Sequence, residues 1–386
     1  MDDLLPAEHQ ELARTVREFA ADRVSPVIAE RYARGEFPLD LVQEMADMGL
    51  FGLPVPEELG GMGGDYLALC VAVEELARVD SSLAITLEAA VSLGAMPLLR
   101  FGSAQLQQQW LPRLSSGAAL GAFGLTEPGG GSDAGATCTT ARLGDDGWTI
   151  NGAKSFITNS GTAISEFVTV TAVTGLRANG SKEISAVLVP HGTPGFTVGA
   201  SYDKVGWRCS DTHELSFSDA VVPESNLVGE RGRGFAQFLS ILDEGRVAIA
   251  ALASGLAAAC VSESVAYAKT RQAFGRPIGA TQGVAFQIAE MEARAHTARL
   301  AWLDAGRQMA AGRPFRRQAA IAKLVCGDAA MANARTATQI HGGYGFTNDA
   351  PVGRFYRDAK ILEIGEGTSE VQKLLIARDL GLPVNP

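Results

Sequence analysis

Apolar residues recur at a helical spacing in the first part of the chain. Up to about residue 118, segments such as AEHQELARTVREFAADRVSPV and LALCVAVEELARV place them three and four positions apart, which is the period of an amphipathic helix. The stretch PVPEELGGMGGD between these segments is rich in proline and glycine and predicts a loop. We therefore expect an N-terminal helical domain over residues 1–118.

The period changes to two between about residues 119 and 230. In EFVTVTAV, Val168 and Val170 alternate with Thr169 and Thr171, and HELSFSD repeats the alternation. The segments GDDG, ANG and HGTPG are typical turns and separate short strands. This part of the chain is therefore predicted to be a small β-barrel or sandwich.

The helical period returns after about residue 231. The run RVAIAALASGLAAAC is apolar nearly all round, so its helix should be buried on several sides. A later helix should carry the seam of a helix bundle, with apolar residues that step by four and three: Val284, Ile288, Met291, Ala295, Ala298 and Trp302. Helices, strands and helices in this order predict an α+β protein with three domains, 1–118, 119–230 and 231–386.

Composition and charge narrow the function classes. The 386 residues are 46% hydrophobic and 20% charged, as in an ordinary soluble globular protein. The net charge of −10 and the lack of a Lys/Arg-rich block argue against nucleic-acid binding. The sequence contains no G-x-S-x-G, no G-x-x-x-x-G-K-[ST] and no H-E-x-x-H, so hydrolase, nucleotide triphosphatase and zinc-protease functions lose their usual support.

Cysteine usage and the N-terminus predict a cytoplasmic protein. The five cysteines are far apart and form no C-x-x-C, which favours reduced thiols. A helical pattern begins almost at the first residue, without a signal or transit peptide or a long apolar span. We expect no membrane association, and the histidines have no metal-ligand spacing.

The segment GLTEPGGGSDAGA, residues 124–136, is the most glycine-rich stretch. It contains a formal G-x-G-x-x-A from Gly129 to Ala134, but the following TCTTARLGDDGWTING reads as strand and turn. A dinucleotide fingerprint would require a helix there. Two interpretations remain open, a surface turn and a loop whose backbone N–H groups bind phosphate, with Thr126 and Ser132 as further donors.

Two other segments have both a structural and a functional interpretation. QIHGGYGF, residues 339–346, ends a predicted helix at a glycine pair, as a C-cap requires, although His341 could contact a ligand. TRQAFGRPI, residues 270–278, places Arg271, Arg276 and Phe274 at the end of the Ala-rich helix, where cations are favourable in any case.

The segment EIGEGTSEVQ, residues 363–372, presents one carboxylate, Glu366, between two glycines. Ser369 and Gln372 fit a capping box at the start of a helix. The helix dipole would favour the Glu366 anion, whereas burial against an apolar ligand would raise its pKa. From the pattern alone, Glu366 is either an acid that complements the dipole or a general base.

Taken together, these segments resemble the acyl-CoA dehydrogenase family over essentially the whole chain. GLTEPGGGSDAGA, QIHGGYGF and RDAKILEIGEGTSEVQKLLIAR are similar to family motifs and occur in the family order, as does VGWRCSDTHELSFSDAVVPESNLVGERGRGF. The resemblance implies a helical domain, a β-domain and a C-terminal four-helix bundle. It also implies FAD bound between the β-domain and the bundle, and a homotetramer built as a dimer of dimers.

The resemblance also implies roles for individual residues, with Glu366 as the catalytic base. FAD would contact Leu125, Thr126, Gly131, Ser132, Phe156, Ile157, Thr158, Thr368, Ser369 and Glu370. A neighbouring subunit would add Arg271, Phe274, Gln282, Gln339, Ile340, His341, Gly342 and Gly343. The substrate would contact Ser132, Asp243, Glu244, Gly245, Arg246, Gly365 and Gly367.

The implied reaction is α,β-dehydrogenation of a short- or branched-chain acyl-CoA to the trans-2-enoyl-CoA. Glu366 would remove the α-proton, FAD would take the hydride, and electron-transfer flavoprotein would accept the electrons. One alternative is an oxygen-using flavoenzyme of the same fold, either an acyl-CoA oxidase or a monooxygenase. The other is a non-catalytic flavin- or acyl-binding protein, against which the presence of Glu366 argues.

Three positions depart from common family patterns. Phe156 stands where many members have tryptophan. Gly245 stands where a subset carries the base, which leaves that role to Glu366. Gly365 stands where tyrosine is common, so the acyl specificity is open.

Overall fold

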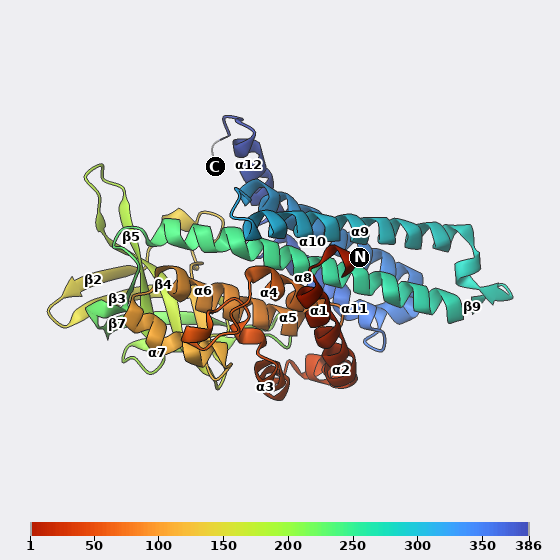
Figure 1. The fold of residues 1–386 in the computed structure, drawn as a ribbon, viewed down its shortest axis with the longest axis horizontal. Helices are drawn as coiled ribbons and strands as arrows, with labels where there is room; N and C mark the ends of the chain where they lie inside the picture. Colours follow the sequence, from red (N-terminus) through yellow and green to blue (C-terminus); the bar gives the residue numbers. More distant parts are fainter. Residues whose placement is uncertain (1, 385–386) are drawn as a thin grey trace.

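The computed structural model describes residues 2–384 and has three successive blocks, helical, stranded and helical (Figure 1). The first block contains α1 (Ala7–Phe19), α2 (Ser25–Arg34), α3 (Leu39–Asp47), α4 (Tyr66–Ala77), α5 (Ser81–Glu88), α6 (Met96–Phe101) and α7 (Ala104–Ser115). The stranded block contains β1 (Leu120–Gly124), β2 (Thr140–Gly144), β3 (Gly147–Thr158), β4 (Ser165–Leu176), β5 (Lys182–Pro190), β6 (Phe196–Ser201), β7 (Thr212–Val222) and β8 (Leu227–Val228). The last block contains α8 (Gly234–Thr270), α9 (Gln282–Ala310), α10 (Arg316–His341), α11 (Pro351–Ala359) and α12 (Ser369–Asp379), with the short strands β9 (Gln272–Ala273) and β10 (Arg276–Pro277) between α8 and α9.

The predicted α+β class is confirmed. The changes from helix to strand and back fall between residues 115 and 120 and between residues 228 and 234, near the predicted limits of 118 and 230. Strands β1 to β8 form one sheet in the order β6-β7-β3-β2-β4-β5-β8, in which β1 pairs in parallel with β4, and β9 and β10 form a separate antiparallel pair.

Strand β4 is buried on both faces. Val168 and Val170 join the core inside the sheet, whereas Phe167, on the opposite face, joins the core of the helices. Thr169 and Thr171 share the face of Phe167, because side chains alternate along a strand, and both are buried. The alternation of valine and threonine predicted the strand, but its polar face packs toward the helices.

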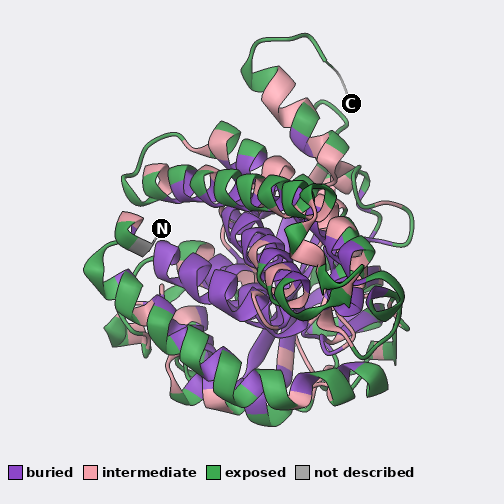
Figure 2. Ribbon diagram, turned by 90° about the vertical axis from the view of Figure 1, so that its right-hand side faces the viewer, coloured by how far each residue is buried: buried purple, intermediate pink, exposed green. Residues whose placement is uncertain are grey.

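Helix α8 is the central element of the C-terminal block. Its 37 residues span about 55 Å at 1.5 Å per residue, and the predicted apolar run within it is buried nearly throughout. Figure 2 shows buried helices in the middle of the bundle and exposed faces on the outer helices. The predicted seam of α9 is buried from Met291 to Trp302 and half-buried at Val284 and Ile288.

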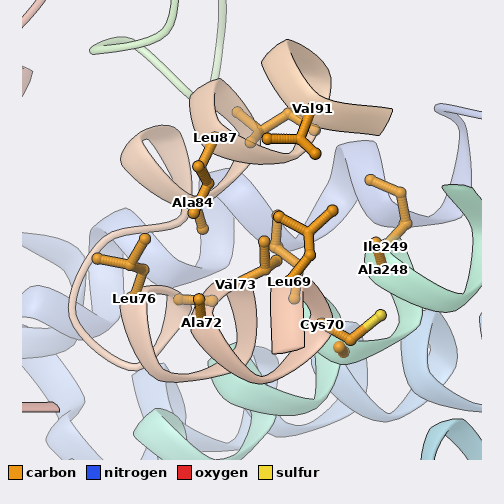
Figure 3. Close-up of a cluster of buried hydrophobic side chains, with 14 of the residues drawn as sticks. Leu69, Cys70, Ala72, Val73, Leu76, Ala84, Leu87, Val91, Ala248 and Ile249 are labelled. Atoms are coloured by element: carbon orange, nitrogen blue, oxygen red, sulfur yellow. The ribbon is translucent and has the colours of Figure 1, made fainter. Parts of the chain in front are cut away.

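Two helical stretches have the length and apolar composition of a membrane span, Ser81–Phe101 and Gly234–Thr270. In both, more than four fifths of the most apolar window is buried inside the protein. Side chains from α4, α5 and α8 meet there in one apolar cluster that includes Leu69, Leu87 and Ile249 (Figure 3). These stretches are core helices of this fold.

Candidate active site

Glu366 lies in the short connection before α12, in a left-handed backbone conformation. Its φ is 53° and that of Gly367 is 94°. Residues with a side chain rarely adopt a φ of 94°, and a Cβ at Gly367 would also lie 2.8 Å from the side-chain nitrogen of Gln372, so the backbone conformation favours glycine here. A left-handed glutamate is strained by an amount on the order of 1–3 kcal/mol, and such strain is typical of functional sites.

The predicted capping box at the start of α12 is wrong in its details. Thr368, not Ser369, is the N-cap, and its hydroxyl accepts a hydrogen bond from the Val371 N–H at 3.3 Å. The Gln372 side chain donates to the Gly367 carbonyl at 2.9 Å instead of reaching the N-cap N–H. These two contacts fix the turn that presents Glu366.

The carboxylate of Glu366 has the environment expected of a general base. Neither carboxylate oxygen touches solvent, and neither accepts a hydrogen bond from an N–H or alcohol O–H group within residues 2–384. Burial raises the pKa of Glu366 from its usual 4.5 to about 7, while a hydrogen bond with the Glu88 carboxyl and the charges of Lys323 and Arg246 pull the pKa down. Such a carboxylate is ionised in part at neutral pH and is basic enough to take a proton.

Lys323 of α10 is the buried cation behind this turn. Its ammonium group donates to the Gly367 carbonyl at 2.8 Å. Burial lowers the pKa of Lys323 to about 8, and the charge of Glu366 opposes that shift. Sequence reasoning did not select Lys323, because nothing in the run AAIAKLVCG distinguishes it from a solvated lysine.

Of the predicted substrate residues of α8, Gly245 and Arg246 lie near Glu366. A Cβ at Gly245 would lie 2.5 Å from one Glu366 oxygen, so only glycine leaves room for the carboxylate as placed. Asp243 forms ion pairs with Arg246 and with Arg316. Glu244 pairs with Arg100 at 3.3 Å.

A second carboxyl, Glu88, meets Glu366 at Gly245. Glu88 is fully buried at the end of α5, and the same Gly245 Cβ would lie 3.6 Å from one of its oxygens. Sequence reasoning missed Glu88, although one acid within the apolar run AITLEAAVSLGAM was a usable signal.

The glycine-rich segment comes after β1 and is stabilised by a buried ion pair. Lys154 contacts Glu127 at 2.7 Å and also donates to the Leu125 carbonyl. Glu127 accepts two backbone hydrogen bonds, from the N–H groups of Cys138 and Thr139. The chain then forms a 3₁₀ turn and β2 instead of a helix, so the rejection of a Rossmann helix is confirmed.

The middle of the predicted flavin loop is open. Gly131 and Ser132 are exposed, and no atom lies within 4 Å of a Cβ built at Gly129. Thr126 is half-buried beside them, as is Leu125. The backbone N–H groups of this loop are therefore accessible to a ligand, as a phosphate-binding loop requires.

The end of β3 presents Phe156 outward. Its φ is 60°, its side chain is 66% exposed, and its ring stacks on Tyr202 at 4.9 Å between centroids. Ile157 is buried and Thr158 is half-buried. An exposed aromatic ring held in a left-handed turn is suited to stacking against a flat ligand.

The cofactor residues predicted to come from a neighbouring subunit gather at the opposite end of α8, whereas Thr368, Ser369 and Glu370 lie at the start of α12 beside Glu366. Arg271 and the segment from Ile340 to Gly343 line a cavity of about 440 Å³ together with Tyr267. Phe274 is fully exposed nearby, and Gln282 begins α9. Figure 1 shows β9 at one end of the molecule and the sheet at the other, so one chain does not unite these residues with the glycine-rich segment.

Three family models together match nearly the whole chain. Acyl-CoA dehydrogenase, N-terminal domain, matches residues 6–118, the middle domain matches residues 122–220, and the C-terminal domain matches residues 232–381.

In residues 2–384, no group of three or more His, Cys, Asp or Glu side chains could bind a metal ion.

Full-length relatives are similar to this chain. It is 46% identical to a probable acyl-CoA dehydrogenase of Bacillus subtilis, over 97% of this chain and 98% of that protein. It is 44% identical to the mitochondrial short-chain specific acyl-CoA dehydrogenase of Mus musculus, over 97% of this chain and 90% of that one.

Solved structures give the same result. Butyryl-CoA dehydrogenase from Megasphaera elsdenii has a TM-score of 0.93 at 40% identity, with 97% of this chain and 98% of that chain covered. A glutaryl-CoA dehydrogenase from Mycobacterium smegmatis in complex with FADH2 has a TM-score of 0.94 at 30% identity, with 100% and 98% covered. A chain solved in work on the electron transferring flavoprotein of Acidaminococcus fermentans has a TM-score of 0.94 at 40% identity, with 97% and 98% covered.

Proposed function

The chain belongs to the acyl-CoA dehydrogenase family, and from this membership we propose that Glu366 is the base that removes the α-proton of a short- or branched-chain acyl-CoA. The family reaction is an FAD-dependent dehydrogenation of an acyl-CoA. The observation that carries the proposal is the solvent-free carboxylate of Glu366, whose pKa is raised to about 7.

The residues around Glu366 explain how it works. A thioester α-proton is weakly acidic, so the base must be close, oriented and free of water. The left-handed turn at Glu366 and Gly367 aims the carboxylate at Gly245, whose missing side chain leaves space beside it. Backbone N–H donors near the thioester oxygen would stabilise the developing enolate charge.

The described residues fit FAD. The open glycine-rich loop and Ser132 would bind the phosphates, and Phe156 with Thr158 would lie along the ring system. When bound, FAD supplies an electron-accepting ring that takes the β-hydrogen as hydride. Thr368, Ser369 and Glu370 would bring the cofactor next to the turn of Glu366.

A second copy of the chain would complete this site. Arg271 lies beyond the C-terminus of α8, about 55 Å from the start of that helix, and the sheet lies at the helix start. We propose a homotetramer, a dimer of dimers, in which Arg271, Phe274, Gln282 and residues 339–343 reach the cofactor of a neighbour.

Arg271→Ala should weaken FAD binding about tenfold and shift the assembly toward smaller species. A charge-assisted contact to phosphate is among the stronger polar interactions, and the Arg271 guanidinium now lies over the Tyr344 ring at 6.0 Å. FAD content and light scattering on the same samples would measure both effects. Arg276→Ala, on the same hairpin, is the control, and equal behaviour of the two variants would refute the role of Arg271.

Gly365→Tyr should narrow the acyl specificity. A Cβ at Gly365 meets only Ile361, at 3.5 and 3.8 Å, so a side chain can be added without a clash at its base. An aromatic ring there would fill space beside Glu366, and lost room for one methyl group is worth on the order of 1–3 kcal/mol. We expect kcat/KM for isobutyryl-CoA to fall about tenfold more than kcat/KM for butyryl-CoA, whereas equal losses would show that the space is already filled.

An anaerobic panel of acyl-CoA thioesters, followed by bleaching of the flavin, tests the proposed function. We expect thioesters with short or branched acyl groups to bleach the flavin and electron-transfer flavoprotein to reoxidise it. We also expect the protein to act in the cytoplasm. Turnover with oxygen as the only acceptor would favour the oxidase alternative. Failure of every thioester to bleach the flavin would exclude the proposed substrate class.

A further inference from the structure

We propose that Glu88 is a positioning residue for Glu366: a neutral, protonated carboxyl that lies against the ionised base and holds it in place. This inference rests on the proposed role of Glu366 as the base. It concerns a residue that belongs to none of the sequence motifs of the site.

The two carboxyl groups meet at one point in the fold. A Cβ built on Gly245 would be 2.5 Å from an oxygen of Glu366 and 3.6 Å from an oxygen of Glu88. Both oxygens are close to this one position, so the distance between them cannot exceed these two distances added together. All four carboxyl oxygens are buried away from solvent. Each carboxyl is the hydrogen-bonding neighbour of the other, and the Ser92 hydroxyl also lies beside Glu88.

Two adjacent ionised carboxylates without water or donors are not tolerated, because each buried anion already carries a large desolvation cost. One member of the pair must therefore keep its proton at neutral pH. In such a pair the protonated group can donate its O–H to the ionised one.

The surrounding charges decide which member ionises. Glu366 faces two cations, Lys323 on α10 and Arg246 on α8, and Lys323 also contacts the next carbonyl of the turn. Both cations stabilise the anion of Glu366, so Glu366 is the member that loses its proton.

Apart from Glu366, the groups that face Glu88 are neutral. Tyr66 and Cys70 of α4 face it, and burial raises the pKa of each well above its usual value. The Ser92 hydroxyl lies beside Glu88 and is hydrogen-bonded to the Tyr66 hydroxyl at 2.5 Å. Burial first, and then the charge of Glu366, raise the pKa of Glu88 well above the usual value.

The local fold fixes Glu88 in this position. It is the last residue of α5 and immediately precedes a π-helical segment, Ala89–Ala95, a feature that is frequent at functional sites. Its neighbours Leu87 and Val91 pack into the apolar cluster of Figure 3. A rigid apolar frame is what a positioning residue needs.

Two substitutions in the FAD-loaded enzyme separate a hydrogen-bond donor from a spacer. Glu88→Gln keeps a donor of the same shape, whereas Glu88→Met keeps only the volume. We expect Glu88→Met to move the acidic limb of the kcat/KM profile upward by about one pH unit, because the anion of Glu366 loses a donor. Glu88→Gln should stay close to wild type and so rescue the profile.

An infrared measurement tests the protonation state without relying on activity. The C=O band of a protonated carboxylic acid should be present in wild type at pH 8 and absent from Glu88→Gln. Loss of a carboxylate band instead, or a downward shift of the acidic limb in both variants, would show that Glu88 is ionised and overturn the proposal. Unchanged profiles in both variants would make Glu88 a packing residue only.

These outcomes can be told apart from a failure of the proposed function. If Glu366→Gln kept its activity, the base would have to be another residue. The infrared band would still report whether Glu88 holds a proton, so each claim can fail separately.

Discussion

Glu366→Gln should keep its FAD and lose acyl-CoA dehydrogenation. A positioned base is typically worth about 10²–10⁴-fold in rate, and the glutamine amide cannot accept the α-proton. Gly245 occupies the position from which some family members supply the base, but it has no side chain and cannot replace Glu366. Anaerobic stopped-flow reduction of the flavin by butyryl-CoA would measure the loss directly.

The control for this variant is Glu8→Gln. Glu8 is an exposed acid in the first turn of α1, so the same chemical change there should leave reduction unaffected. Reduction of the flavin at the wild-type rate in Glu366→Gln would remove Glu366 from the role of base.

Glu366→Gln should also be more stable than wild type at alkaline pH. Because burial raises the pKa of Glu366 from 4.5 to about 7, ionising this carboxyl costs more in the folded chain than in the unfolded chain. The cost is absent below pH 4.5 and complete above pH 7. We therefore expect the melting temperature of Glu366→Gln to exceed that of wild type at about pH 8 and to approach it at about pH 5.

Periodicity predicted the elements of this fold because each period reflects a local geometry. The three- and four-residue spacing in α9 corresponds to a helix with one buried face, and the all-round apolar run in α8 corresponds to a helix buried on several sides. The alternation in β4 predicted the strand, but it does not reveal that Thr169 and Thr171 are buried too. That burial depends on packing between domains, which no local window contains.

The site was predicted where a motif carries it and missed where it depends on distant contacts. Glu366 stands out because glycines flank it in sequence. Glu88 and Lys323 approach it only through folding, from positions 278 and 43 residues away. The residue type alone does not show whether a charged side chain is buried or solvated, so its role can be assigned only when its neighbours are known.

The sequence also does not reveal that the predicted cofactor residues lie at two distant places in one chain. A family resemblance assigns Arg271 and Thr126 to one ligand, whereas Arg271 follows the C-terminus of α8 and Thr126 follows β1 of the sheet, which lies at the other end of the molecule. A single sequence does not specify that a second copy must supply part of a site.

Lys323→Met should shift the pH dependence of catalysis upward. Lys323 lowers the pKa of Glu366, and it is the first of the two cations that do so. Without this cation the pKa of Glu366 should rise above 7 by about one to two units, the usual effect of one nearby charge. Since only the ionised carboxylate accepts a proton, kcat/KM at about pH 7 should fall about five- to fiftyfold and recover as the pH rises through the new pKa.

The chain offers a matched control in Lys154→Met. Lys154 is also fully buried, and burial lowers its pKa to about 8 as well, but its partner is Glu127 under the glycine-rich loop. Removing one member of a buried ion pair costs on the order of 3–5 kcal/mol, so this variant should lose thermal stability without moving the acidic limb. A limb that moves equally in both variants would show a general loss of structure. A limb that stays in place in Lys323→Met would show that Lys323 serves only to anchor the Gly367 carbonyl.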